Sequence, residues 1–296
     1  MPSGQAKSRH DHASRHDGAV PNAASLFAPI SAWPVERVAA LAIGPDECVY
    51  SFGNTDEPFR LASVTKIVTA YAALVAIEER TISLDEPAGP PGATVRHLLA
   101  HASGLPLNSS HPIAEPGRRR IYSNTGINAV ASLIADRSQM PFDQYLRDGV
   151  IDPLGMAHFT LPGAPAWGGV ASASDMLAFM RELRSPRLIS KATLADATTP
   201  QFPELNGVLP GLGPQRPNPW GLGFEIRGDK APHWTGSSNS PRTFGHFGQS
   251  GTFVWIDPDV NMACVVLTRT EFGVWAKAAW PPFSDSLRSA LLTPVT

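Results

Sequence analysis

The chain has 296 residues, of which 43% are hydrophobic and 17% are charged, a composition that fits one large domain or a domain with an insertion. Its 24 basic residues nearly balance its 26 acidic ones. The chain therefore lacks the basic excess that is typical of nucleic-acid-binding proteins. The one basic run is Arg118-Arg119-Arg120, and we interpret it as a solvated loop edge.

The first 25 residues are polar and contain no apolar segment of the kind a secretory signal needs. We expect them to form a disordered tail. No later stretch approaches the ~20 consecutive apolar residues that cross a bilayer. These features predict a soluble, cytoplasmic protein that does not contact membranes.

Two short strands are predicted next, at residues 35–43 and 47–52, joined by the turn Gly44-Pro45-Asp46. A helix is predicted over residues 63–80, because no Gly or Pro interrupts this run and apolar residues recur on almost every side. Such a helix is buried along its length. Ser63 is a good N-cap residue, so the polar start of the helix is the part that could face a cavity.

Residues 82–160 predict short helices and loops, with no strong strand pattern; the helical segments are 95–102, 124–138 and 141–155. Another amphipathic helix is predicted at 173–185. The following segment, 203–221, is crowded with Pro and Gly and therefore predicts a long, shaped loop.

Strand patterns then return, at residues 221–226, 242–248, 252–258 and 262–268. The last three are spaced as hairpins, which favours antiparallel pairing. Helix-like segments over 274–292, broken by Pro281-Pro282, close the chain. Strands at both ends with helices between them predict an α/β fold, in which residues 26–80 and 165–296 form one split domain and residues 81–164 a helical insertion.

Only two cysteines are present, Cys48 and Cys264. Two cannot build a disulfide framework or a zinc site, and each lies in an apolar, strand-like run. We predict buried free thiols, with a single disulfide still possible if the two strands prove to be neighbours.

The first chemical pattern is Ser63-Val64-Thr65-Lys66. Residues three apart on a helix share a face, and a serine hydroxyl becomes a strong nucleophile when a neighbouring base takes its proton. A lysine can be that base if burial lowers its pKa. Alone the pattern is weak, because an N-cap serine followed by a solvated lysine is common.

Two further patterns are equally modest when taken singly. In Tyr122-Ser123-Asn124 the phenol could shuttle protons and the amide could hold a substrate carbonyl or the lysine, although a turn with an Asn cap explains the same residues. In His246-Phe247-Gly248 the glycine could let substrate approach a strand edge, and the N–H groups of Gln249 and Ser63 could form an oxyanion hole.

The order and surroundings of these patterns carry more weight. The chain resembles the serine β-lactamase and penicillin-binding-protein superfamily, in its class C-like branch of esterases and D-amino-acid peptidases. The resemblance covers roughly residues 33–268 and rests on five blocks in family order: GNTDEPFRLASVTK, HLLAHASGLP, PGRRRIYSNTGINAVASLIA, PFDQYLRDGVIDPLGM and GHFGQSGTFVWIDPD.

The resemblance implies an antiparallel sheet flanked by helices, with a helical domain beside it and the site in the cleft between. It implies that Ser63 is acylated and that Lys66, Tyr122 or both act as the base. Asn124 would orient substrate. His246 stands where many members carry a lysine, which weakens the case for an obligatory substrate carboxylate, since histidine is often neutral near pH 7.

We therefore expect a serine hydrolase that acts on small-molecule esters or amides through an acyl-serine intermediate, without a metal or other cofactor. A D-amino-acid peptidase or weak β-lactamase is the alternative within the enzyme class. A penicillin-recognising binding protein without turnover is the alternative from another class. The oligomeric state is left open.

Several residues match the motifs of other catalytic or metal-binding sites only in part. Ser250 lies in Gly248-Gln249-Ser250-Gly251-Thr252, which lacks the last Gly of an α/β-hydrolase elbow, so we expect a hairpin residue. His97 and His101 have zinc-helix spacing, but Leu98 replaces the required Glu. His10, His12 and His16 have no fixed scaffold to hold a metal. Trp220 and Trp234 could line an acyl pocket or simply pack.

Overall fold

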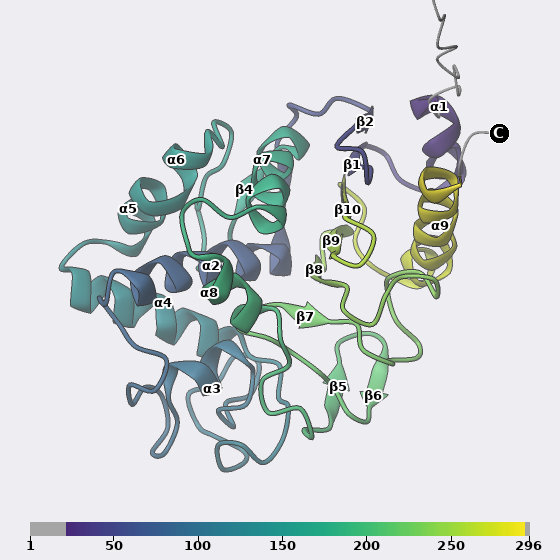
Figure 1. Ribbon diagram of the computed structural model, residues 1–296. Coiled ribbons are helices and arrows are strands. Elements are labelled where there is room, and N and C mark those ends of the chain that lie inside the picture. The colour runs from purple at the N-terminus through teal and green to yellow at the C-terminus, as the bar shows by residue number, and fades with distance from the viewer. Residues whose placement is uncertain (1–21, 294–296) are drawn as a thin grey trace, which may run out of the picture.

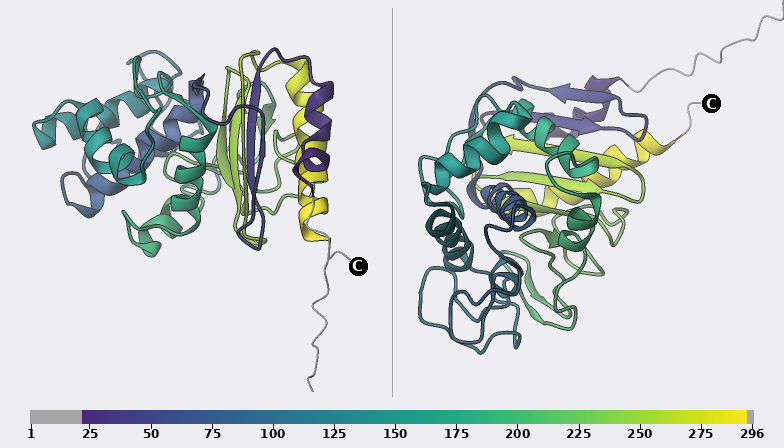
Figure 2. Two further views of the ribbon diagram at one scale, coloured as in Figure 1. Left: turned by 90° about the horizontal axis from the view of Figure 1, so that it is seen from above. Right: turned by 60° about the vertical axis from the view of Figure 1, so that its left-hand side comes forward.

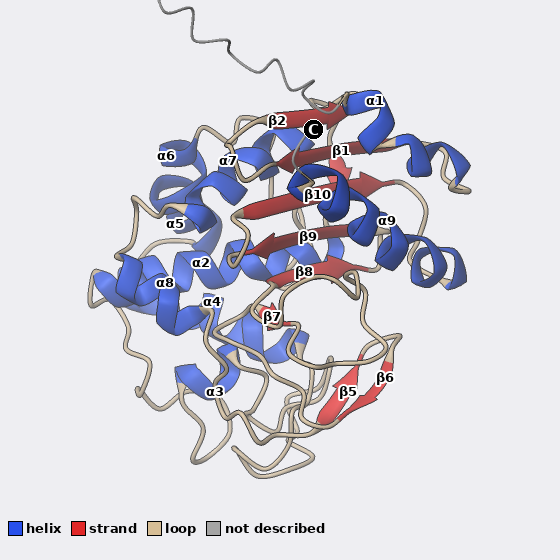
Figure 3. Cartoon of the chain, turned by 45° about the vertical axis from the view of Figure 1, so that its right-hand side comes forward, coloured by secondary structure: helices blue, strands red, loops and turns tan. Residues whose placement is uncertain are grey.

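The computed structural model describes residues 22–293. Its centre is a six-stranded antiparallel sheet in the order β2-β1-β10-β9-β8-β7 (Figure 3). The strands are β1 (Val38–Ile43), β2 (Val49–Phe52), β7 (Glu225–Ile226), β8 (Phe244–Gly248), β9 (Thr252–Asp257) and β10 (Met262–Thr268). The N-terminal hairpin joins the last strand, with Leu41 opposite Val265, so segments from the two ends of the chain complete one sheet, as the sequence predicted.

Both faces of this sheet are covered, and β1 and β10 are accordingly almost entirely buried. In β1, Ala39, Leu41 and Ile43 belong to one core cluster, while Ala40 and Ala42 belong to a second cluster on the opposite face. Seen from above, the sheet lies between a helical layer on either side (Figure 2, left). Side chains that alternate along a strand thus fill two different cores.

The helices of the second core are short α1 (Ala23–Leu26) and long α9 (Val274–Leu292). The other side carries α2 (Thr65–Glu78) and α7 (Ala173–Arg184), with α8 (Lys191–Ala197) nearby (Figure 1). Further helical pieces lie between α2 and α7 in the chain; they are α3 (Val95–Leu99), α4 (Asn124–Ser138), α5 (Phe142–Leu146), a π-helical turn at Arg147–Ile151 and α6 (Asp152–Leu154).

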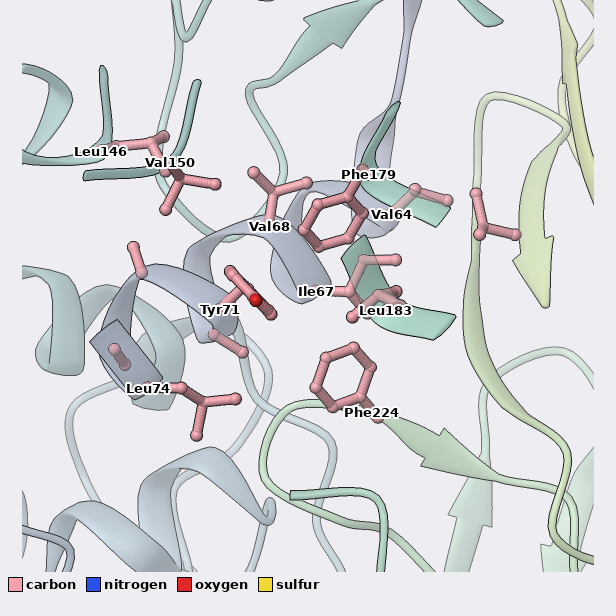
Figure 4. Packing of buried hydrophobic residues seen from close by; sticks show 14 of the residues in the cluster. Val64, Ile67, Val68, Tyr71, Leu74, Leu146, Val150, Phe179, Leu183 and Phe224 are labelled. Carbon is pink, nitrogen blue, oxygen red and sulfur yellow. The ribbon is translucent and has the colours of Figure 1, made fainter. Parts of the chain in front are cut away.

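Helix α2 runs through the middle of the larger core, and every residue from Thr65 to Ala76 is buried. Figure 4 shows its apolar side chains among those of the neighbouring elements. The Tyr71 ring meets Phe179 edge to face at 5.4 Å, and its hydroxyl donates to Glu182 at 2.7 Å. The predicted buried helix is confirmed, although its ends lie inside the predicted 63–80.

Two further pairs of short strands lie outside the central sheet. Strand β3 (Phe59–Arg60) pairs with β4 (Val170–Ala171). The predicted loop 203–221 contains β5 (Gly207–Leu209) and β6 (Gly213–Gln215). The predicted strand 221–226 shrinks to the two residues of β7, because the segment before it turns instead of extending.

Three sequence predictions about helices were wrong. Ser63 does not cap α2: it lies in a 3₁₀ turn (Ala62–Val64), and the helix starts at Thr65 without a side-chain cap. Helix α9 continues through Pro281 and Pro282, because buried Trp280, Phe283 and Leu287 anchor one face, although each proline removes a helical hydrogen bond. The predicted tail 1–25 is wrong at its C-terminal end, because α1 already begins at Ala23; residues 1–21 lie outside the described part.

The cysteines are free thiols, as predicted. β1 lies between the strand that follows Cys48 and the strand that carries Cys264, so the possible disulfide is ruled out by topology. Cys264 is buried, whereas Cys48 is only half-buried. The division into a split domain and a helical insertion stays a prediction.

Arg120 was interpreted wrongly as part of a solvated edge. Its side chain is buried and donates hydrogen bonds to the carbonyls of Asn218, Gln201 and Phe202 at 2.6–3.0 Å, and to that of Ala100. One guanidinium thereby ties the Pro-rich loop to the end of α3. Arg118 and Arg119, in contrast, are exposed.

We predict that Arg120→Met lowers the thermal midpoint markedly, whereas Arg119→Met does not. The substitution keeps the apolar stem but leaves buried carbonyls unpaired, at a cost of about 1–3 kcal/mol for each group that water cannot reach. Circular dichroism melting of both variants checks this. Equal midpoints for the two would contradict the assigned role of Arg120.

Candidate active site

Ser63 lies in a tight turn that is held on both sides. The β8–β9 hairpin fixes one side, where the hydroxyls of Ser250 and Thr252 donate to the carbonyls of Arg60 at 2.6 Å and Leu61 at 3.0 Å. On the other side the Leu61 N–H donates to the carbonyl of Gly169 at 2.8 Å. Within the turn Ala62 has a φ of 47°, a left-handed conformation that a non-glycine residue adopts only when its surroundings impose it.

Gly248 has a packing role that the sequence analysis did not predict. A Cβ at this position would come within 2.3 Å of the Leu61 carbonyl oxygen, so the glycine allows the turn that carries Ser63 to pack directly on β8. The approach of substrate along this strand edge stays a prediction. Gly248 therefore positions the nucleophile's turn.

Lys66 is one turn along from Ser63 and is completely buried. Its Nζ lies 3.3 Å from Ser63 Oγ, 2.6 Å from Asn124 Oδ1 and 2.8 Å from the Ala166 carbonyl oxygen. The described residues offer it no carboxylate within ion-pair distance. Burial without a counter-charge lowers the pKa of Lys66 from 10.5 to about 7.

The neutral form of this amine fits its surroundings closely. Two of the three neighbours, the Asn124 amide oxygen and the Ala166 carbonyl, can only accept hydrogen bonds. They match the two N–H groups of a neutral amine and leave its lone pair for the third neighbour, the Ser63 hydroxyl. The arrangement can therefore accept a proton from Ser63.

Asn124 is oriented by a residue that the sequence analysis did not single out. Its Nδ2 donates to Asn108 Oδ1 at 2.8 Å, which turns its own Oδ1 toward Lys66. Asn124 is the first residue of α4, and Ser123 caps that helix by accepting from the Gly126 N–H at 2.9 Å. The cap is thus Ser123, whereas the alternative reading of the motif assigned it to Asn124.

Tyr122 and His246 meet above the same site. The phenol oxygen lies 3.4 Å from His246 Nε2, and the ring lies under Lys66 Nζ at 4.7 Å from its centroid. Burial, which outweighs an opposing hydrogen bond with Ser63, raises the pKa of Tyr122. The phenol accordingly keeps its proton at neutral pH and can donate it.

His246 is buried and neutral. Burial, reinforced by the nearby Lys66, lowers its pKa to about 3. Its Nδ1 lies 2.6 Å from the Phe247 carbonyl oxygen, which only a protonated Nδ1 can satisfy, so Nε2 carries the lone pair that faces Tyr122. In this tautomer His246 accepts a hydrogen bond from the phenol and offers no positive charge to a substrate.

A cavity of about 380 Å³ brings these groups together. Ser63, Tyr122, Asn124, His246 and Gln249 all line it. The other walls are mostly apolar and come from Leu107, Trp167, Leu209, Pro210, Trp220 and Phe247. Six of the seven predicted site residues thus converge, since Lys66 reaches Ser63 from below; Gly248 alone acts through packing. The oxyanion hole of Ser63 and Gln249 stays a prediction.

A buried cluster of charged and polar side chains that the sequence analysis missed lies next to Trp220, a residue of the cavity wall. Glu225 accepts hydrogen bonds from Lys230 at 2.7 Å and His233 at 2.8 Å, and from the Trp234 indole. Lys230 Nζ lies 5.7 Å from the centre of the Trp220 ring. Trp220 lines the cavity as the sequence allowed, whereas Trp234 is used for packing and for this hydrogen bond.

The residues that partly match other motifs have structural roles. Ser250 is in the β8–β9 turn, as predicted. His97 contacts Thr94 at 3.0 Å, and His101 accepts from the Ser123 N–H at 3.2 Å. Within residues 22–293 no group of three or more His, Cys, Asp or Glu side chains could hold a metal; His10, His12 and His16 lie outside them. In the same part of the chain no helix is long and apolar enough to span a membrane.

Comparisons with known proteins agree with this geometry. A protein-family model described as Beta-lactamase matches residues 38–284. A solved structure of a beta-lactamase from Mycobacterium bovis is 50% identical, covers 90% of this chain and 100% of its own, and superposes with a TM-score of 0.88. Simvastatin synthase from Aspergillus terreus shares the fold at 17% identity, with a TM-score of 0.75 over 91% of this chain and 94% of its own.

Among curated sequences, the D-alanyl-D-alanine-carboxypeptidase/endopeptidase AmpH from Escherichia coli is 26% identical over 147 residues. That match covers 37% of this chain and spans only 38% of the relative's length. It therefore supports common ancestry more than a shared substrate.

The lowered pKa of Lys66 predicts the pH dependence of any reaction that uses it as the base. Below pH about 7 the ammonium cannot accept the Ser63 proton, so kcat/KM for a neutral ester should rise tenfold per pH unit and level off above pH 8. A stopped-time assay from pH 5 to 10 measures this, with Lys66→Met expected to be nearly inactive and flat. A rise that begins only above pH 9 would instead assign the base role to the Tyr122 phenolate.

Proposed function

The chain belongs to the Beta-lactamase family, and we propose that it is a serine hydrolase that cleaves small esters through an acyl-serine intermediate on Ser63. The observation that carries the proposal is the 3.3 Å contact between Ser63 Oγ and the buried, uncompensated Lys66 Nζ. Membership alone supplies serine hydrolase chemistry. The finer assignment to esters rests on the walls and charges of the cavity.

In the proposed reaction Lys66 accepts the Ser63 proton while Oγ attacks the substrate carbonyl carbon. The oxygen of the tetrahedral intermediate takes the negative charge and is held by the N–H groups of Ser63 and Gln249. The intermediate collapses, the bond to the leaving oxygen breaks, and that oxygen receives a proton. Water then attacks the acyl-serine and gives its proton to the same base. The base passes this proton to Ser63 Oγ as the acyl bond breaks, which releases the acid and free Ser63.

Tyr122 is the proposed donor to the leaving group. Its phenol keeps its proton because burial raises its pKa. The phenol oxygen lies 3.4 Å from His246 Nε2, and Lys66 Nζ lies 4.7 Å from the centre of the ring. After giving its proton away, the phenolate is re-protonated from the Lys66 ammonium. Of the two alternatives that the sequence left open, we thus propose Lys66 as the base and Tyr122 as the acid.

The choice of esters follows from two features of the cavity. His246 is neutral and its Nδ1–H is already bonded to the Phe247 carbonyl, so it offers no cation at the position where many relatives carry a lysine. Much of the wall is apolar, including half-exposed Leu107 and Trp167 at 45% each. An apolar acyl group fits such walls better than a peptide does.

A weak β-lactamase activity is the second candidate, and the 50% identity to the Mycobacterium bovis protein named a beta-lactamase favours it. The two candidates share the acyl-serine step and differ in the acyl group. Hydrolysis of nitrocefin with a higher kcat/KM than that of 4-nitrophenyl butyrate would move this candidate to first place.

We predict that a fluorophosphonate probe labels the wild type and that the protein hydrolyses 4-nitrophenyl acetate. Ser63→Ala should abolish labelling and lower kcat by at least about a thousandfold, as expected when a covalent nucleophile is removed. Ser286→Ala, an exposed serine of α9 outside the cavity, is the matched control. Labelling that survives in Ser63→Ala would disprove the assignment of the nucleophile.

A wild type that labels but never releases its acyl group would favour the non-turnover binding protein instead. Intact-mass spectrometry after a single ester addition distinguishes the cases, since a hydrolase returns to its unmodified mass.

Trp167 predicts a preference for longer acyl chains. Each methylene that the apolar wall shields from water contributes about 0.8 kcal/mol, so the wild type should prefer butyrate to acetate esters. Trp167→Ala should reduce that preference about threefold, because part of the shielding wall is removed. Val274→Ala on α9, an exposed apolar position outside the cavity, serves as the control. An unchanged butyrate-to-acetate ratio in Trp167→Ala would exclude Trp167 from the acyl site.

A further inference from the structure

A second cavity, of about 490 Å³, adjoins the one that contains Ser63. The two cavities share Arg60, Ala62 and Gln249 as lining residues, so these three residues form the border between them. Ala62 precedes the nucleophile directly. The border between the two cavities therefore lies directly beside the nucleophile.

Arg60 is the charged residue of that border. It ends strand β3, where it pairs with Val170, and its carbonyl accepts the Ser250 hydroxyl, so its backbone is fixed. Its side chain is exposed, and within residues 22–293 its guanidinium makes no hydrogen bond or ion pair. A guanidinium has five N–H donors suited to carboxylate or phosphate, and here all five are available.

The neighbouring acid that could have neutralised Arg60 is occupied elsewhere. Glu57 accepts a hydrogen bond from Arg37 at 3.1 Å and forms an ion pair with Arg269 at 2.6 Å. Arg269 also lines the second cavity, where Glu271 is the acidic residue. Glu271 does not line the cavity of Ser63, so an anion would be favoured at the shared border, beside Arg60, more than deeper in the second cavity.

The charge of the catalytic cavity also favours an anion beside Arg60. Arg60 is the only Lys, Arg, Asp or Glu among its lining residues, and His246 is neutral. In a mostly apolar cavity with one unpaired cation, a substrate anion of complementary charge forms charge-assisted hydrogen bonds without competing acids. Arg60 lies three positions before Ser63, so their Cα atoms are at most about 11 Å apart, a distance that a small molecule can bridge.

We infer that the substrate of this site carries an anionic group, a carboxylate or phosphate, which Arg60 binds at the border between the two cavities. This inference rests on the proposed esterase function and specifies its substrate: one part apolar, held by the Trp167 and Trp220 walls, and another part ending in an anion that passes Gln249. Arg60 is thus a specificity-determining residue whose contribution depends on substrate charge.

The test compares esters that differ in charge, in two series. In the first the anion is on the acyl part, as mono-4-nitrophenyl glutarate against 4-nitrophenyl valerate. In the second it is on the alcohol, as 4-carboxyphenyl against 4-methylphenyl butyrate. The anionic-to-neutral ratio of kcat/KM is measured for wild type, Arg60→Gln and Arg60→Glu after subtraction of uncatalysed hydrolysis. Arg181→Gln, an exposed arginine of α7 outside both cavities, is the matched control.

We expect Arg60→Gln to lower the ratio about 5- to 20-fold in one of the two series, which then identifies the part of the substrate that passes Gln249. Arg60→Glu should lower it further, and 0.5 M NaCl should reduce the wild-type ratio by screening. A general loss of activity cancels in the ratio, so a folding defect cannot imitate the result. The control should keep the wild-type ratio.

The inference is overturned if Arg60→Gln keeps the wild-type ratio in both series while the neutral esters are hydrolysed. That outcome leaves the proposed esterase function intact. If the wild type hydrolyses none of the four esters and no fluorophosphonate labels Ser63, the proposed function fails and the inference fails with it.

Discussion

The burial of the Lys66 amine among three oxygen atoms, with no carboxylate beside it, is the constraint on which the site depends. A buried ammonium without a counter-ion is costly, so the group releases its proton near neutral pH. Between pH about 7 and 10.5 the unfolded chain binds this proton more tightly than the folded chain does. Burial of Lys66 therefore lowers the free energy of unfolding most at and below neutral pH. This loss of stability disappears as pH rises toward 10.5. A carboxylate in place of the Ala166 carbonyl would remove that cost, and with it the free lone pair that faces Ser63.

The fold maintains this environment from several directions. Helix α2 brings Lys66 into the core, α4 brings Asn124 to it, and the segment before β4 supplies the Ala166 carbonyl. The β8–β9 hairpin holds the turn of Ser63 through the Arg60 and Leu61 carbonyls. Arg120 fixes the Pro-rich loop whose residues Leu209 and Trp220 complete the cavity. The reacting groups thus stand on packed elements, which keeps their geometry fixed before substrate arrives.

Sequence reasoning succeeded where local pattern and fold agree. The continuous apolar runs indicated sheet strands, the run without Gly or Pro indicated α2, and five blocks in family order indicated Ser63, Lys66, Tyr122, Asn124 and His246. It failed where residues far apart in the sequence determine the position or role of a side chain. Nothing local shows that Arg120 reaches carbonyls some 80 to 100 residues away, that Gly248 admits the Leu61 carbonyl, or that anchored aromatic residues carry α9 through two prolines. Asn108, Ala166 and Arg60 were missed because each acts only through its position in space.

The most direct test of whether Lys66 releases its proton near neutral pH is an NMR titration of its side chain. Protein labelled with ¹³C at the lysine ε-carbons can be followed from pH 5 to 11, with the Lys66 signal assigned by its disappearance in Lys66→Met. The account predicts a midpoint near pH 7 for this signal, while the exposed lysines titrate near 10.5. A Lys66 midpoint close to that of the exposed lysines would contradict it, because an ammonium could not then take the proton of Ser63 at neutral pH.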